Sequence, residues 1–134
     1  MKIDKQITIC KLGTAFKIFP ESKNEIGLWI AHPPCFIVSA NEKVENVINE
    51  ALQYSNSGEK ATNDTALLVL RELHLKSWNS LYKTHEIISF SITAERIIIT
   101  PFIYSRKGAF PETKRKLIYS RREYQNAIKE LLIF

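Results

Sequence analysis

The residues that could do chemistry in this chain are two cysteines and three histidines, and one pair of them is close in sequence. His32 and Cys35 are separated by two prolines, which is the H-x-x-C spacing of half a zinc site. A structural zinc takes four ligands, and no second pair follows at a suitable spacing, so we expect no metal and no cofactor. A cysteine–histidine nucleophile pair would meet in space rather than in sequence, and nothing local favours one. We therefore expect no catalytic residues and a protein that is not an enzyme.

The expected compartment determines the expected state of the two cysteines. Cys10 and Cys35 both lie in segments with strand-like patterns, and the residues after Met1 lead into no apolar stretch of a secretory signal. No apolar run reaches the ~18 residues needed to span a bilayer. We expect a cytoplasmic protein, with no membrane partner, in which both thiols are reduced and act as small buried hydrophobic groups.

The elements that must position these residues follow an internal repeat at an offset of 81 residues, which becomes 80 after a one-residue slip. Alternating apolar residues predict the strands, and the i, i+3, i+4, i+7 spacing predicts one helix with an apolar stripe at the end of each copy. The paired strand segments are 7–12 with 88–93, 14–20 with 95–101, and 36–39 with 116–119. The helix stripes are Val44, Val47, Ile48, Ala51 and Leu52 in one copy and Tyr124, Ala127, Ile128, Leu131 and Leu132 in the other.

The predicted fold class is therefore α+β, in a single domain of residues 1–134. Two repeated βββα units, 6–53 and 87–134, would form antiparallel sheets covered by helices, either as one six-stranded sheet or as two small packed sheets. The helical segment 54–86 would join them. Asn63-Asp64 offers a cap for a helix over 65–73, and Ser77 for a short helix carrying Trp78. Asn41 and Ser120 are the expected caps of the two repeat helices, and residues 102–115 are expected to form an exposed irregular loop.

The net charge of +5 is confined to one region. Residues 96–122 contain eight lysines and arginines against the single Glu112, which gives +7, while the rest of the chain is slightly acidic. Aromatic residues are interleaved with these cations, a combination that can bind a polyanion or an acidic protein face. In the first copy the helix is acidic, so the protein should be an electrostatic dipole.

Three stretches resemble the family of immunity proteins of contact-dependent growth inhibition. One is KSWNSLYKTHEIISFSITAERIIITP (76–101), where a short Lys/Trp-containing helix precedes a strand pair ending in proline. The others are FIVSANEKVENVINEAL (36–52) and LIYSRREYQNAIKELL (117–132), each a strand, a polar step and an amphipathic helix. The resemblance covers roughly two-thirds of the chain.

The resemblance implies a small, cytoplasmic, non-enzymatic binding protein. Such a protein neutralises the C-terminal toxin domain of a cognate effector in a one-to-one complex, by covering its active or substrate-binding surface, and the toxin is often a nuclease. Two surfaces remain as alternatives for the toxin interface. The basic-patch version uses Tyr104, Arg106, Lys107, Phe110, Arg115 and Arg122. The acidic-helix version uses Glu42, Glu45, Asn49 and Glu50.

A different function is the alternative to an immunity role. The basic patch of residues 96–122 could bind single-stranded nucleic acid, which predicts an affinity that falls steeply with salt. Because the charge is local rather than general, nucleic acid is the less favoured partner.

Overall fold

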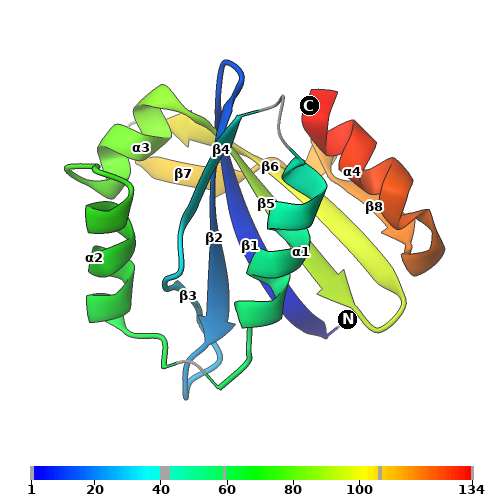
Figure 1. The fold of residues 1–134 in the computed structure, drawn as a ribbon, viewed down its shortest axis with the longest axis horizontal. Coiled ribbons are helices and arrows are strands. Elements are labelled where there is room, and N and C mark those ends of the chain that lie inside the picture. The colour runs from blue at the N-terminus through cyan, green and yellow to red at the C-terminus, as the bar shows by residue number, and fades with distance from the viewer. Residues whose placement is uncertain (1, 40–42, 59, 106, 134) are drawn as a thin grey trace.

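The computed structural model describes residues 2–39, 43–58, 60–105 and 107–133. Within them, eight antiparallel strands form one curled sheet with the order β3-β2-β1-β5-β6-β7, and β4 and β8 extend it by pairing with β2 and β6 (Figure 1). The strands are β1 (Ile3–Leu12), β2 (Ala15–Lys23), β3 (Trp29–Ala31), β4 (Phe36–Ser39), β5 (Glu86–Thr93), β6 (Arg96–Ser105), β7 (Gly108–Pro111) and β8 (Leu117–Ser120). The helices are α1 (Val44–Tyr54), α2 (Asn63–Glu72), α3 (Trp78–Thr84) and α4 (Tyr124–Ile133), with short 3₁₀ turns η1 (Thr113–Arg115) and η2 (Arg121–Glu123). The predicted α+β class is correct.

One face of the sheet, called here the first face, is covered by α1 and α4. Alternate strand residues such as Ile7, Ile9 and Phe90 point to this face and pack against the apolar stripes of the two helices. Figure 1 shows α1 in front of β1 and β2, with α4 to its right over β6 and β8. Lys5 and Lys11 of β1 attach the C-terminal ends of both helices to the sheet. Their ammonium groups donate hydrogen bonds to the carbonyls of Leu52 and Leu132, at 3.0 and 3.1 Å.

The opposite face, called here the second face, is covered by α2 and α3. The intervening strand residues, including Cys10, Phe19 and Ile87, form a smaller core with Val69, Leu73 and Leu81. Ser77 caps α3 with the reciprocal hydrogen bonds of a capping box. Of the predicted elements of the middle segment, α3 begins where expected, whereas α2 begins after Thr62, so Asn63-Asp64 is the first turn of that helix and not its cap.

The two halves of the chain meet at the centre of the sheet, where β1 pairs with β5 and Thr8 lies opposite Ser89. The pairing of β2 with β4 and that of β6 with β8 share a register at an offset of 81, since Phe16 pairs with Val38 and Ile97 with Tyr119. The pairings of the short strands β3 and β7 depart from that offset by one residue. Each half also contains four strands followed by a helix rather than the expected three. That the halves are repeats of one unit stays a prediction.

Three predictions about the elements need correction. The sheet has eight strands rather than six, because β3 and β7 are short additional strands. Residues 102–115 are not an irregular loop, since β6 continues to Ser105 and forms a hairpin with β7. The strand expected at 116–119 lies at Leu117–Ser120, which moves the one-residue slip to the step between that strand and α4.

Of the two predicted caps of the repeat helices, one can be compared with the structure. Ser120 does cap the last helical segment, with the Ser120 amide donating to Glu123 at 3.1 Å in η2, which leads directly into α4. Asn41 lies outside the described residues, and Lys43 is the residue that precedes α1. No helix among the described residues is long and apolar enough to cross a bilayer.

Candidate functional site

The residues of the predicted basic patch are distributed along β6. Tyr104, Lys107 and Phe110 lie on the β6–β7 hairpin, whereas Arg122 lies in η2, which follows the strand paired with the other end of β6. The span of β6 from residue 96 to residue 105 is nine steps, or roughly 30 Å at about 3.3 Å per residue. The structure therefore separates the hairpin from Arg122.

Arg115 occupies the space between these two positions, and it is not a free cation. It lies in η1, and its guanidinium forms an ion pair with Glu112 at 3.3 Å. Arg106 lies outside the described residues. The part of the predicted patch that stays together is the hairpin, where exposed aromatic and cationic side chains are neighbours.

The acidic-helix residues are partly engaged by α4. The Gln125 amide donates to the Glu45 carboxylate at 2.5 Å, and the Tyr124 hydroxyl donates to the Asn49 side chain. Burial and the neighbouring Glu45 raise the pKa of Tyr124 to about 12, so the phenol keeps its proton. Glu50 is exposed on α1, and Glu42 lies outside the described residues. Glu45 and Asn49 thus help to join the two helices of the first face.

The histidine and cysteine of the H-x-x-C sequence have separate structural roles. The Pro33 carbonyl accepts a hydrogen bond from His32 Nδ1 at 2.7 Å, so in the neutral ring Nε2 accepts from the Ser22 hydroxyl at 2.6 Å. This is the geometry of a serine–histidine dyad. However, Ser22 and His32 are only 2% and 1% exposed, which leaves no room for a substrate. The pair instead fixes the corner between β2 and β3.

The two thiols lie near each other beneath α2 and α3, and both are free. Burial raises the pKa of Cys35 to about 12 and that of Cys10 still further, so neither is a ready nucleophile. Across the described ranges, no three His, Cys, Asp or Glu side chains come together in a way that could hold a metal ion.

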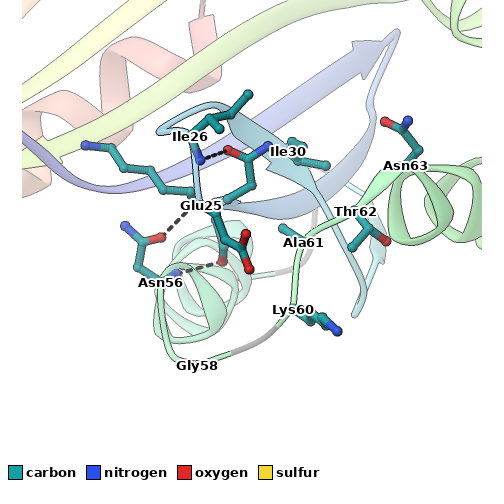
Figure 2. A pocket seen from close by; sticks show the side chains of 12 residues that line it. Glu25, Ile26, Ile30, Asn56, Gly58, Lys60, Ala61, Thr62 and Asn63 are labelled. Carbon is teal, nitrogen blue, oxygen red and sulfur yellow. Dashed lines mark hydrogen bonds between the residues drawn. The ribbon is translucent and has the colours of Figure 1, made fainter.

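An open depression lies between the β2–β3 loop and the link from α1 to α2 (Figure 2). Asn56 fixes one side of the depression. Its side-chain oxygen accepts a hydrogen bond from the backbone N–H of Lys23, and its own backbone N–H donates to the Ser22 hydroxyl, both at 2.8 Å. Ile26 stands at its rim with 79% of its surface exposed. The depression is wide and shallow, and it presents no converging set of charged groups.

A second cavity, called here the aromatic pocket, is the better candidate. It has a volume of about 290 Å³ and lies on the second face, between the sheet, α3 and the β6–β7 hairpin. Its aromatic walls are Phe19, Trp29, Trp78, Tyr82 and Phe102. Phe19 and Trp78 lie 5.8 Å apart between ring centroids, and Trp78 stacks on Tyr82 at 6.2 Å. Aromatic rings from four elements, β2, β3, α3 and β6, thus line one space.

The sheet supplies a polar side to the aromatic pocket, and a carboxylate is at its centre. Glu21 lies opposite Gln6 in the β1–β2 register, and its Oε1 accepts from the Thr8 hydroxyl at 2.7 Å and from the Gln6 amide at 3.2 Å. Gln6 is oriented in turn by Ser91, whose hydroxyl donates to the Gln6 side-chain oxygen at 2.8 Å. Burial raises the pKa of Glu21 from its usual value of 4.5, while the two hydrogen bonds oppose that change.

Sequence reasoning missed this site. Eight elements contribute to the aromatic pocket, and they are brought together only by the fold. A signal did exist in the strands: Gln6, Thr8, Ser89 and Ser91 alternate with apolar residues, which indicates a sheet face that helices do not cover completely. Trp29 and Trp78 are both partly buried pocket residues. Trp78 packs against the smaller core of the second face.

The fold defines a class of α+β proteins that includes a chain from a toxin–immunity pair. No known protein family and no curated protein matches the sequence. Among solved structures, a chain of the CdiA-CT/CdiI toxin and immunity complex from Yersinia pseudotuberculosis is similar with a TM-score of 0.63 and 10% identity, over 90% of this chain and 89% of that one. A protein of unknown function from Neisseria meningitidis has a TM-score of 0.62 and 13% identity, over 90% and 88% of the two chains. At these identities the similarity shows the fold alone.

Proposed function

We propose that the protein is an immunity protein that binds and neutralises the toxin domain of a cognate contact-dependent growth inhibition effector. The observation that carries the proposal is the fold, which this chain shares over 90% of its length with a chain of a toxin and immunity complex. The three sequence stretches that resemble this family support it independently. In this proposal the protein works in the cytoplasm, is not an enzyme, and blocks a nuclease by covering its active or substrate-binding surface.

The second face is the surface we assign to the toxin. On the β6–β7 hairpin, Phe102 and Ala109 line the aromatic pocket, and the exposed Tyr104, which is paired with Ala109, lies on the same side of the hairpin. Phe110 is paired with Ile103 and points to the other side. Interfaces favour aromatic and arginine side chains at their centre. The first face supports this choice by contrast, because α1 and α4 cover it and Glu45 and Asn49 are used between them.

The test is protection of growing cells. The toxin domain encoded next to the gene for this protein is induced in a bacterial host with and without this chain, and purified chain is used to capture the same domain. We expect restored growth and a one-to-one complex. Growth inhibition by this chain alone, or no capture together with no protection, would overturn the proposal.

A nucleic-acid assay separates the alternative function. Labelled single-stranded DNA and RNA of mixed sequence are titrated with the protein at about 50 mM salt, where contacts between lysines and phosphates are strong. We expect no saturable binding, because the cations are spread along β6. Tight binding that weakens steeply with salt would favour the nucleic-acid function over the immunity function.

A further inference from the structure

We propose that the aromatic pocket is a receptor for an arginine side chain presented by the protein partner, with Glu21 as the carboxylate that binds its guanidinium. The proposal rests on the proposed function for the identity of the partner, but the chemistry of the pocket is argued from this chain alone. Its three parts are an incompletely bonded carboxylate, a wall of stacked rings and a cavity of suitable size.

The carboxylate lacks a cation. Both hydrogen bonds recorded for the Glu21 side chain end on Oε1, and no donor among the described residues reaches Oε2. The ion pair between Arg115 and Glu112 lies in η1, away from this strand. A carboxylate held in surroundings that disfavour its charge is stabilised by any cation that enters. Among the described residues Glu21 therefore forms no ion pair, and the nearest recognised cation contact at the pocket is the Lys23 ammonium over the Trp29 ring, 5.4 Å from its centroid.

The chain of hydrogen bonds from Ser91 through Gln6 to Glu21 holds that carboxylate in place. The hydroxyl of Ser91 donates to Gln6, so the Gln6 amide group turns toward Glu21, and Thr8 fixes the same oxygen. A group whose orientation is already fixed loses little entropy when a ligand arrives. The site is therefore organised before the partner binds.

The aromatic wall selects the kind of cation. Ring faces attract cations, and planar guanidinium groups stack on them better than a hydrated ammonium ion does. A guanidinium also keeps its proton in surroundings that would remove one from a buried lysine. The volume of about 290 Å³ lies just below the range for small-ligand pockets, ~300–1,000 Å³, which suits one side chain and not an extended ligand. Arginine satisfies all of these conditions.

The experiment begins with small probes, so that it does not depend on the toxin. The chain has two tryptophans, Trp29 and Trp78, and both line the pocket. Indole fluorescence and the indole N–H signals in NMR spectra therefore report its occupancy. The probe is N-acetyl-arginine methylamide, compared with its neutral citrulline analogue and with the lysine analogue. We expect saturation by the arginine probe with Kd on the order of 1 mM, weaker binding of lysine and none of citrulline.

Two variants make the assignment specific. Glu21→Gln keeps an oxygen that can accept from Thr8 and Gln6 but removes the charge, and it should weaken the arginine probe at least tenfold. Glu25→Gln removes an exposed carboxylate from the adjacent β2–β3 loop and should change nothing. Equal binding of arginine and citrulline, absence of any saturable shift in the wild-type protein, or an unchanged affinity in Glu21→Gln would overturn the proposal.

The partner is tested last. If the toxin domain is captured, Glu21→Gln should weaken that complex at least tenfold. Changing one arginine of the toxin to glutamine, a neutral residue that can be genetically encoded, should cause the same loss. Full toxin affinity in Glu21→Gln would show that the partner does not use the pocket. Failure of the toxin to bind wild-type protein would instead overturn the proposed function, while the probe titration would still decide the chemistry of the pocket.

Discussion

The two faces of the sheet are built from alternate residues of the same strands, yet they differ in composition and closure. On the first face, Ile7, Ile9 and Phe90 are buried beneath α1 and α4 in the larger of the two apolar cores, and its two lysines, Lys5 and Lys11, bond the carbonyls near the helix C-termini. On the second face the same strands present Gln6, Thr8 and Glu21, and α2 and α3 leave a cavity above them. A closed apolar face stabilises the fold, whereas a half-covered face with polar residues is available for recognition.

The largest expected effect comes from opening the first face. Phe90 is fully buried, and its ring meets Tyr124 edge-on at 6.1 Å between centroids. Phe90→Ala should lower the free energy of unfolding by about 3–5 kcal/mol in urea titrations. Phe102→Ala, which truncates a partly buried ring of the aromatic pocket, is the matched control and should cost clearly less. Equal losses would mean that the two faces contribute alike to stability.

The next effect tests the link between the α1 C-terminus and the strands of the pocket. The buried Ser55 hydroxyl accepts a hydrogen bond from the backbone N–H of Gln6 at 2.8 Å and donates one to the backbone carbonyl of Glu21 at 2.6 Å. Ser55→Ala leaves both backbone groups without this partner and should cost about 1–3 kcal/mol in thermal or urea unfolding. Ser57→Ala, at an exposed position, should stay within about 0.5 kcal/mol of wild type. A neutral Ser55→Ala would show that water replaces the hydroxyl.

The sequence predicts the first face of the sheet better than the second. Apolar periodicity predicts the elements of the first face, because strands such as 7–12 and the helix stripe from Val44 to Leu52 can be identified from residues adjacent in the chain. The aromatic pocket was not predicted, since Trp78 and Phe102 come from segments far along the chain from Glu21 and Trp29, and no spacing rule relates them. The predicted basic patch was continuous in sequence, but an extended strand places its ends far apart.

A smaller effect, of opposite sign, is expected at Glu21. Because burial raises its folded pKa above 4.5, the ionised carboxylate opposes folding, and the wild-type protein should lose stability as the pH rises through the folded pKa. Cys10 and Tyr82, which face Glu21, keep their protons over this range because their pKa values are raised. Glu21→Gln should therefore stabilise the free protein at neutral pH by ~0.5–2 kcal/mol.

Unfolding measured from acid to neutral pH checks this prediction. The gain should disappear at pH values below about 4.5, where the wild-type carboxyl is protonated in both the folded and the unfolded chain. A Glu21→Gln protein that is less stable at neutral pH would indicate that the carboxylate serves the fold and not a ligand.

The smallest effect on stability is expected from reversing one exposed charge in each of the two candidate interfaces. Lys107→Glu on the hairpin and Glu50→Lys on α1 should each change the free energy of unfolding by less than about 0.5 kcal/mol. With the captured toxin domain, Lys107→Glu should slow association about tenfold at low salt, while Glu50→Lys should leave the rate nearly unchanged. Stopped-flow association rates provide the measurement, and the reverse result would move the interface to α1.

The pairing of β1 with β5 has a consequence for how the chain folds. The hairpins β1–β2 and β5–β6 close over two-residue turns, 13–14 and 94–95, whereas the central ladder joins Thr8 to Ser89. The loss of chain entropy grows with the length of the loop that a contact closes, so the hairpins should form early and the central ladder late. Amide exchange in refolding pulses should then show the two halves protected first and the seam between them last. A slow final step would assemble both faces, and the aromatic pocket, at once.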